Sequence, residues 1–364
     1  MRVLLINPGL RHVLPQLRFM AASGIDVHCV NLRPGARLDS EGITNYDWHA
    51  GEQRSSGFEK LAFLRQGVRA RRFTRWLKPD IVHAHYATSA GLVAYLSGYH
   101  PYVVTIHGSD LLLRGKSRLG RAILSPVLRN ADCVNPVAEH MTGLLRHLGV
   151  DTHKTLALTF GVDLQELPFV PCNSRFDGGV RLLCTRSLGS PVYDIPTLLF
   201  AVAKARSRGC KVTLTLAATG SLSPSLTQLA GDLGISDAVT FGKGYSIADL
   251  PALMRCHDVY VSSSLSDGAS ISLMEAMACG IFPIVSDIPA NTEWLEHGRN
   301  ALLFPTGDAD RLAELICQLP SQLSFVEAAV KLNRTMAEDR ADQMKNLGSL
   351  IGHLRSISRA RPRA

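Results

Sequence analysis

The sequence has no closely spaced cysteine pair and no long apolar run. Its eight cysteines are scattered through 364 residues, and no two are closer than twelve positions. This spacing excludes a CxxC clamp or a compact disulfide framework and is typical of reduced thiols in a cytosolic protein. No apolar stretch approaches the ~20 residues that a membrane-spanning helix needs. The apolar run in MRVLLINPGL has four residues, too few for a signal peptide. We therefore expect a cytoplasmic protein that is soluble or lies at the inner face of the cell membrane.

The charge balance is basic, with a net charge of +8. Such a balance suits nucleic acids, anionic lipid headgroups or phosphate-bearing substrates. Residues 58–78 interleave apolar side chains with cations that include Arg65, Arg69, Arg71, Arg72, Arg75 and Lys78. This pattern predicts a basic amphipathic helix, which either lies in a membrane interface or packs its apolar stripe on a domain core. No nucleic-acid partner is expected, because the cluster lacks a known recognition module.

The strand and helix patterns repeat in two halves. The first half has apolar strand candidates at 3–7, 25–32, 80–86, 102–108 and 132–138. The second half has them at 181–188, 211–219, 238–244, 258–264 and 282–287. Helical patterns lie between them, and such alternation predicts the α/β class with two parallel, doubly wound sheets.

We divide the chain into two Rossmann-like domains, residues 1–165 and 179–335. A linker rich in proline, glycine and polar residues joins them at 166–178. Residues 336–364 are expected to form a C-terminal helix that packs back on the first domain, followed by a basic tail. Two such domains usually bind ligand in the crevice between them, at the carboxyl ends of the strands.

One stretch, SLSDGASISLMEAMACGIFPIVSD, carries two carboxylates eight positions apart, Asp267 and Glu275. It predicts a buried strand, a turn of small residues and a helix that Ser270 or Ser272 caps and Gly280 ends. The free N–H groups and dipole of that helix start suit a diphosphate. Asp267 can accept hydrogen bonds from sugar hydroxyls, and Glu275 can accept both hydroxyls of a ribose.

The segment DGASISLMEAMACGIFPIVSDIPANTEWLEHGRNALLFPTGD resembles the donor-binding region of retaining GT-B glycosyltransferases of the E-x7-E group (family 4, group 1). That motif reads Asp267-x7-Glu275 here. The stretches PDIVHAHYATSAGLVAYLSGYHPYVVTIHGSD, TFGVDLQEL and RLLCTRSL are similar to other parts of the same family. The resemblance implies the GT-B fold, in which two Rossmann-like domains face each other across a cleft. The first domain would hold the acceptor and the second the nucleotide sugar.

The resemblance also implies roles for individual residues. Asp267 would contact the transferred sugar, Glu275 the ribose and Arg186 the diphosphate leaving group. The sugar and phosphates would be contacted by the N–H groups of Gly268, Ala269, Ser270 and Ile271. His107, in TIHGSD, would approach the donor sugar and the reacting centre. The alternative for His107 is a structural histidine bonded to a backbone carbonyl.

The sequence departs from the family pattern in its carboxylate and its second cation. Asp267 is one methylene shorter than the usual glutamate. Tyr193, in SLGSPVYDI, stands where the family has a lysine. Lys243 could replace that lysine or could be a solvated loop residue.

The glycine-rich turn after the first strand is reduced to NPGLRH, with Gly9 as its single glycine. Arg11 or His12 could supply the missing anion contact. His83 and His85 alternate on one strand and share a face, which permits a metal site. No third ligand motif accompanies them, and we expect no metal and no cofactor.

These features predict a retaining hexosyltransferase that moves a sugar from a UDP- or GDP-sugar to a hydroxyl acceptor, in polysaccharide or glycolipid synthesis. The family's usual mechanism is front-face displacement, in which the leaving diphosphate helps to deprotonate the acceptor. An epimerase or phosphorylase on the same fold would instead consume the donor without an alcohol acceptor. A non-catalytic partner subunit would bind a nucleotide sugar or an active homologue without turnover.

Overall fold

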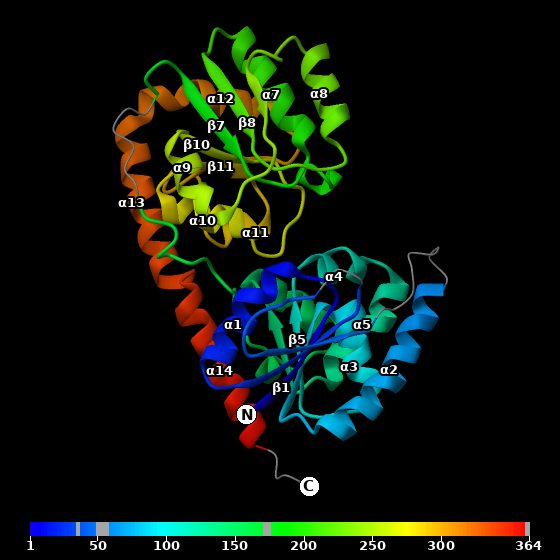
Figure 1. Ribbon diagram of the computed structural model, residues 1–364. Helices are drawn as coiled ribbons and strands as arrows, with labels where there is room; N and C mark the ends of the chain where they lie inside the picture. Colours follow the sequence, from blue (N-terminus) through cyan, green and yellow to red (C-terminus); the bar gives the residue numbers. More distant parts are fainter. Residues whose placement is uncertain (34–36, 49–57, 170–175, 361–364) are drawn as a thin grey trace. The chain divides into compact units, whose positions relative to one another are not determined.

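A computed structural model describes residues 1–33, 37–48, 58–169 and 176–360, without the side chains of residue 11 and residues 58–64. The chain forms two compact units (Figure 1): Met1–Phe160 with Met344–Ala364, and Gly161–Gln343. Part of the predicted linker, residues 170–175, and the end of the basic tail lie outside the described residues.

The first unit is built on a six-stranded parallel sheet in the order β3-β2-β1-β4-β5-β6. The strands are β1 (Arg2–Asn7), β2 (Asp26–Asn31), β3 (Ile43–Asp47), β4 (Ile81–His85), β5 (Tyr102–Ile106) and β6 (Cys133–Pro136). The helices are α1 (Leu14–Ala22), α2 (Phe58–Leu77), α3 (Leu92–Ser97), α4 (Ser109–Leu112), α5 (Arg118–Asn130), α6 (Thr142–His147) and α14 (Gln343–Arg359). The central strands read as apolar runs because both faces of a parallel sheet are buried.

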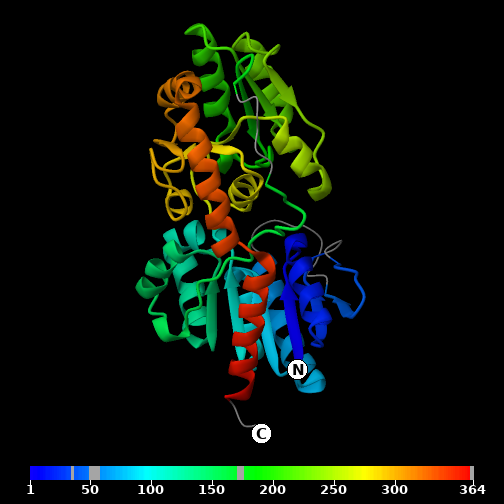
Figure 2. The same ribbon diagram turned by 90° about the vertical axis from the view of Figure 1, so that its left-hand side faces the viewer.

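The C-terminal helix α14 completes the core of the first unit. Leu350 and Leu354 of α14 share one buried cluster with Val3 and Leu5 of β1. Figure 2 shows this helix lying along the sheet of the first unit. The last helix of the chain therefore covers a sheet whose first strand begins at residue 2.

The second unit has a parallel sheet in the order β12-β11-β10-β7-β8-β9. Its strands are β7 (Val180–Cys184), β8 (Val212–Leu216), β9 (Val239–Phe241), β10 (Val259–Ser262), β11 (Phe282–Ser286) and β12 (Leu302–Phe304). Its helices are α7 (Ile195–Ser207), α8 (Ser223–Asp232), α9 (Leu250–Arg255), α10 (Ile271–Cys279), α11 (Pro289–Thr292), α12 (Ala309–Gln318) and α13 (Leu323–Arg340). Leu182 and Leu183, adjacent on β7, enter two different core clusters, as expected for a sheet covered on both faces.

Both sheets have the same doubly wound order, which confirms the predicted fold class. Counted within each unit, the order is 3-2-1-4-5-6, and it reverses between β1 and β4 and between β7 and β10. Ligands of such sheets bind beyond the carboxyl ends of the strands at this reversal. The sequence patterns missed two edge strands, β3 and β12. The first is polar and half-exposed, and the second has three residues, so neither gives a strong apolar signal.

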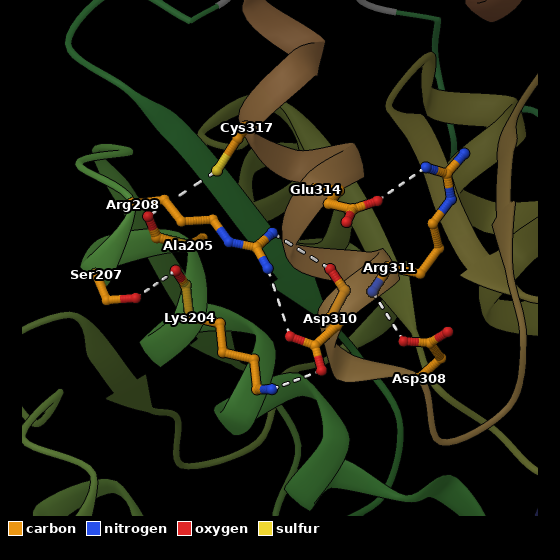
Figure 3. A network of polar contacts seen from close by, with 9 residues as sticks. All are labelled: Lys204, Ala205, Ser207, Arg208, Asp308, Asp310, Arg311, Glu314 and Cys317. Carbon is orange, nitrogen blue, oxygen red and sulfur yellow. Dashed lines mark hydrogen bonds and ion pairs between the residues drawn. The ribbon is translucent and has the colours of Figure 1, made fainter.

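The second unit holds two clusters of polar contacts, one around Asp258 and one around Asp310, that differ in burial. Asp258 is fully buried and accepts hydrogen bonds from the Arg181 backbone N–H (3.0 Å), Nε (2.9 Å) and Nη2 (2.7 Å). Asp310 is exposed on α12 and accepts from Lys204 Nζ (2.6 Å) and Arg208 Nη2 (3.4 Å), as Figure 3 shows. Asp308, two residues earlier, caps α12 by accepting from the Arg311 N–H (2.8 Å). Both carboxylates of this Asp-x-Asp pair therefore have hydrogen-bond partners within the second unit.

Removal of the buried carboxylate should cost far more stability than removal of the exposed one. We expect Asp258→Ala to lower the free energy of unfolding by about 3–5 kcal/mol, because Arg181 loses its buried partner. The control, Asp310→Ala, should leave this free energy nearly unchanged, because solvent screens an exposed pair. Urea denaturation measures both, and equal losses would contradict this view of the two clusters.

Candidate active site

An ion pair occupies the carboxyl ends of β7 and β10, where the strand order of the second unit reverses. Arg186 lies two residues beyond β7, and Asp267 lies in the loop that follows β10. Arg186 Nη2 donates to Asp267 Oδ2 at 2.6 Å, and its Nη1 donates to Ser270 Oγ at 3.4 Å. The guanidinium is buried, with 7% of Arg186 exposed. The structure thus joins two predicted site residues that are 81 positions apart.

Tyr193 covers the guanidinium at the position where the family has a lysine. Its ring centroid lies 4.2 Å from Arg186 Cζ, which is a cation–π contact. The segment that carries Tyr193 is fixed to the β10 loop, since Leu265 N–H donates to Val192 O (2.8 Å) and Ser263 Oγ to Tyr193 O (2.9 Å). The structure therefore places an aromatic ring against the arginine where the family pattern has a second cation.

The electrostatic state of Arg186 follows from two opposed effects. Burial lowers its pKa, but the negative charge of Asp267 raises it, and the net pKa lies above the ordinary value. Its Nε is buried and has no hydrogen-bond partner among the described residues. A permanently charged, buried guanidinium with a free donor is suited to an anionic ligand.

The start of α10 adds backbone donors next to this arginine. Ser270 is the N-cap and accepts from Leu273 N–H (3.4 Å), α10 begins at Ile271, and Gly280 ends it with φ of 79°. These ends confirm the predicted caps. Gly268 N–H donates to Asp267 Oδ1 (2.8 Å), whereas the N–H groups of Ala269 and Ser270 donate to no other described residue. Free N–H groups at a helix start favour an anion.

Glu275 lies inside α10 as a carboxylate without a partner. It is 7% exposed, and no group of the described chain donates a hydrogen bond to it. Burial raises the pKa of Glu275 to about 7, and the charge of Arg186 opposes this rise. A buried carboxyl group that has no donor of its own can accept hydrogen bonds from ligand hydroxyls.

Two further residues of this site were missed by the sequence patterns. Tyr245 OH donates to Thr185 O at 3.4 Å, and burial and the charge of Glu275 both raise the pKa of Tyr245. Thr185 Oγ1 is buried and has no partner among the described residues. Thr185 directly precedes Arg186, and its position after a strand is the sequence signal that could have identified it. Lys243 is exposed after β9 and pairs with no described carboxylate.

In the first unit, His107 lies in a chain of three histidines at the ends of β1, β4 and β5. Its Nδ1 is 3.2 Å from His12 Nε2, and its Nε2 is 3.0 Å from His85 Nδ1. The Tyr86 ring stacks on it with centroids 5.2 Å apart. The alternative of a histidine bonded to a backbone carbonyl is wrong, because both ring nitrogens face other imidazoles. His107 and Gly9 belong to a different unit from Arg186 and Asp267.

Asp110, a residue without a predicted role, organises the loops around His107. It is buried and accepts hydrogen bonds from the N–H groups of Ala87 (2.9 Å), His107 (3.2 Å) and Gly108 (3.0 Å). Burial raises the pKa of Asp110 to about 6 against these hydrogen bonds. Gly108 has φ of 118°, a conformation that favours glycine. The THGSD-like stretch therefore contains a histidine, the glycine of its turn and a carboxylate that ties the turn down.

The other predicted residues of the first unit have internal partners. Gly9 N–H donates to Asn7 Oδ1 (3.1 Å), so it is not a free anion donor. His83 lies between Gln16 Nε2 (3.2 Å) and Thr105 Oγ1 (2.8 Å), so both its nitrogens are taken. No group of three or more His, Cys, Asp or Glu residues in the described ranges could hold a metal. The Arg11 side chain lies outside the described residues.

Two family models match the chain. One, described as glycosyl transferases group 1, matches residues 179–322, and the other, described as glycosyl transferase 4-like, matches residues 2–136. Both matches are to glycosyltransferases, and together they identify the chain as a glycosyltransferase similar to group 1. A D-inositol 3-phosphate glycosyltransferase of Stackebrandtia nassauensis is 26% identical over 371 residues, which cover 88% of this chain and 81% of that protein. The N-acetyl-alpha-D-glucosaminyl L-malate synthase of Bacillus anthracis is 25% identical over 66% of this chain and 65% of its own length, so this chain spans just under two thirds of that relative.

Solved structures show that this glycosyltransferase has the GT-B fold. The sucrose-phosphate synthase from Thermosynechococcus elongatus aligns with a TM-score of 0.85 at 17% identity, over 99% of this chain and 100% of that one. Anabaena Alr3699/HepE in complex with UDP and glucose aligns with a TM-score of 0.79 at 18% identity, over 98% of this chain and 100% of that one. Among the described helices of the glycosyltransferase, none has the length and apolar character to cross a membrane.

Proposed function

We propose that this glycosyltransferase transfers a sugar from a nucleoside diphosphate sugar to a hydroxyl acceptor, with retention at the anomeric carbon. The observation that carries the proposal is the set of groups at the carboxyl-end side of the sheet in the second unit. A buried Arg186, the free N–H groups that start α10 and the partnerless Glu275 match a diphosphate followed by a ribose. The similar Anabaena structure contains UDP and glucose, which favours a uridine nucleotide as the donor.

Each group has a defined task in this proposal. Arg186 and the N–H groups of Ala269 and Ser270 stabilise the charge that develops on the leaving diphosphate. The N–H groups of Gly268 and Ile271, which the resemblance also implied, already donate to Asp267 Oδ1 (2.8 Å) and Ala269 O (3.0 Å). Glu275 accepts hydrogen bonds from the ribose hydroxyls, and Asp267 accepts one from a hydroxyl of the transferred sugar. The bond between the anomeric carbon and the diphosphate oxygen breaks while the acceptor oxygen bonds to the same face. The acceptor proton passes to a departing phosphate oxygen.

The two carboxylates do not form the acid and nucleophile pair of a retaining glycosidase. That pair would need both groups at the anomeric carbon. In the proposal Glu275 is assigned to the ribose, inside α10, and Asp267 is paired with the arginine. Catalysis then depends on orientation of the substrates and on stabilisation of the leaving group, and it requires no divalent metal.

Product analysis tests this proposal. Purified protein is incubated with a UDP- or GDP-sugar and candidate acceptors, with and without EDTA, and nucleoside diphosphate release is measured. The proposal predicts acceptor-dependent release that EDTA leaves unchanged, and a product whose anomeric proton coupling in NMR matches the donor's configuration. Inversion would contradict the mechanism. Conversion of the donor without an alcohol acceptor would favour an epimerase or phosphorylase, and binding without turnover a partner subunit.

For the acceptor we propose a saccharide or lipid-linked glycan presented at an anionic membrane surface, which the protein reaches through α2. Arg65, Arg69, Arg71, Arg72 and Arg75 of this helix are exposed, as is Lys78 directly after it. Trp76 is 68% exposed and Val68 59% exposed on the same helix. Exposed cations around an exposed tryptophan suit a layer of anionic headgroups.

Vesicle binding should depend on these arginines. We expect the triple variant Arg71→Gln, Arg72→Gln, Arg75→Gln to bind phosphatidylglycerol vesicles more than tenfold more weakly, since each cation contributes about 1 kcal/mol at such a surface. Cosedimentation at 0.1 M salt measures the partition. A control that removes the same charge elsewhere, Arg118→Gln, Arg146→Gln, Arg255→Gln, should bind like the wild type. Equal losses in both variants would point to net charge and against an α2 surface.

A further inference from the structure

Three histidines of the first unit, His12, His107 and His85, form one hydrogen-bonded chain with a buried end and an open end. His12 Nε2 faces His107 Nδ1 at 3.2 Å, and His107 Nε2 faces His85 Nδ1 at 3.0 Å. The remaining nitrogen of His85, Nε2, is buried and has no partner among the described residues. The remaining nitrogen of His12, Nδ1, belongs to an exposed residue and has no hydrogen-bond partner within the described ranges.

The buried imidazoles of this histidine chain, those of His85 and His107, are uncharged at neutral pH. Burial lowers the pKa of His85 and of His107 well below the usual range, and the neighbouring imidazoles lower both further. A neutral imidazole has one N–H donor and one acceptor nitrogen. Each of the two hydrogen bonds needs one of each, so the three rings must share the same tautomer.

Only two arrangements satisfy both hydrogen bonds. If every ring carries its proton on Nε2, the chain runs from His12 to His85 and leaves a buried N–H without an acceptor at His85 Nε2. If every ring carries its proton on Nδ1, the chain runs outward and leaves a lone pair at that buried position. Among backbone groups, an orphaned buried N–H is rarer in proteins than an acceptor with an unused lone pair, and we take the same order for imidazole. The second arrangement is therefore favoured, and it puts an N–H on the open side of His12.

We propose that His12 presents an uncharged Nδ1–H donor to an oxygen of a substrate bound at the strand ends of the first unit, and that His107 and His85 fix its tautomer. This inference rests on the proposed function. His12 is the residue that contacts the ligand, through a phosphate or hydroxyl oxygen. His107 and His85 are positioning residues, because both nitrogens of His107 are engaged by the other two rings.

The neighbouring His83 provides an internal reference with the opposite tautomer. Gln16 Nε2 donates to His83 Nδ1 (3.2 Å), which leaves the His83 proton on Nε2, facing Thr105 Oγ1 at 2.8 Å. His83 and His85 are adjacent in space, with ring centroids 4.6 Å apart. Two buried imidazoles in one environment should thus differ in tautomer.

Long-range ¹H–¹⁵N NMR spectra of histidine-labelled full-length protein at pH 7.5 measure the tautomers without any substrate. The proposal predicts the Nδ1–H form for His12, His107 and His85 and the Nε2–H form for His83, with signals assigned by single substitutions. An Nε2–H form of His85 or His107 would overturn it. This result does not depend on turnover, so it is separate from a failure of the proposed transferase function.

Kinetics of His12 variants test the contact itself. His12→Phe keeps a ring but removes the donor and should lower kcat/KM by about 10–100-fold, as expected for one hydrogen bond to a charged or polar ligand oxygen. His12→Asn can place an amide N–H near the lost Nδ1–H and should recover most of this loss. His147→Phe, at an exposed position of α6, is the control and should behave like the wild type.

The substrate that His12 contacts follows from which KM changes. A rise confined to the acceptor KM identifies an acceptor oxygen. If the donor KM rises and the binding of inorganic phosphate or free nucleoside diphosphate weakens as well, His12 contacts a phosphate. If the donor KM rises while that binding is unchanged, His12 contacts a sugar hydroxyl. Full activity of His12→Phe, or equal losses in His12→Phe and His12→Asn, would overturn the role of the donor.

Discussion

Replacement of Glu275 by alanine should weaken nucleoside diphosphate binding by about 100-fold or more. The carboxylate is buried without a donor of its own, so in the proposed site its hydrogen-bond partners are the ligand hydroxyls. Two hydrogen bonds to a charged group are worth about 3 kcal/mol or more, and each 1.4 kcal/mol is a factor of ten. Titration calorimetry with UDP and GDP, on the wild type and the variant, measures the loss directly.

A matched variant separates lost binding from a damaged fold. Glu275→Gln should also bind weakly, yet unfold at higher denaturant than the ligand-free wild type at pH 8. The folded-state pKa of Glu275 is about 7, above its usual 4.5. The contribution of this group to the free energy of unfolding therefore falls as pH rises from 4.5 to 7. Glutamine lacks the buried charge and escapes that loss. A Glu275→Gln variant that binds like the wild type would contradict the ribose role.

The same pKa predicts the pH dependence of binding. The ligand hydroxyls donate to the ionised carboxyl group, so the nucleotide binds the deprotonated form. Affinity should rise about tenfold per pH unit below 7 and level off above it. Binding near pH 7 should release a proton, which calorimetry in two buffers of different ionisation enthalpy detects. An affinity that is flat between pH 5.5 and 7 would contradict the assignment.

Replacement of Arg186 by alanine should lower kcat by about 10²–10³-fold. The guanidinium is the buried cation at the proposed diphosphate site, and loss of one preorganised group that stabilises developing charge has costs of this order. Arg186→Lys keeps the charge but loses the planar fork and the stacking on Tyr193, so it should recover only part of the activity. Steady-state kinetics at saturating donor measures kcat for both.

Tyr193 supplies the control for this arginine. Tyr193→Phe keeps the ring over Arg186 and should retain near-normal kcat, whereas Tyr193→Ala removes the ring and should lower it about tenfold, by the ~1–2 kcal/mol of a buried cation–π contact. If Arg186→Ala kept kcat within a few-fold of the wild type, the leaving-group role would be wrong. Equal kcat in the two Tyr193 variants would contradict a positioning role for the ring.

Local sequence signals predicted the fold and one side of the site. Strand runs followed by helical patterns predicted the parallel sheets, and a small-residue turn with capping residues predicted the helix that begins after Ser270. These features depend on neighbours in sequence, where periodicity and capping residues act. The Arg186–Asp267 pair, whose members are 81 positions apart, depends on which two strands flank the reversal of the sheet. No local pattern encodes that distance.

The same limit applies to the histidines. His107 stood out at a strand end before a glycine, but its partners are 22 and 95 positions away. The family pattern showed that a lysine was missing at Tyr193 but not that the ring stacks on the arginine. Asp110 was overlooked because its partners are backbone N–H groups, which every residue except proline has. Such contacts become visible only in three dimensions.

A thermal-shift panel of UDP-, GDP-, ADP- and TDP-sugars, on the wild type and on Glu275→Ala, tests the central claim most directly. A ligand that binds only the folded state raises its stability in proportion to the logarithm of its concentration over Kd. We predict that one nucleotide class raises the Tm of the wild type and leaves that of Glu275→Ala unchanged. No shift with any nucleotide sugar at millimolar concentration, or the same shift in both proteins, would contradict a nucleotide-sugar site at Arg186, Asp267 and Glu275.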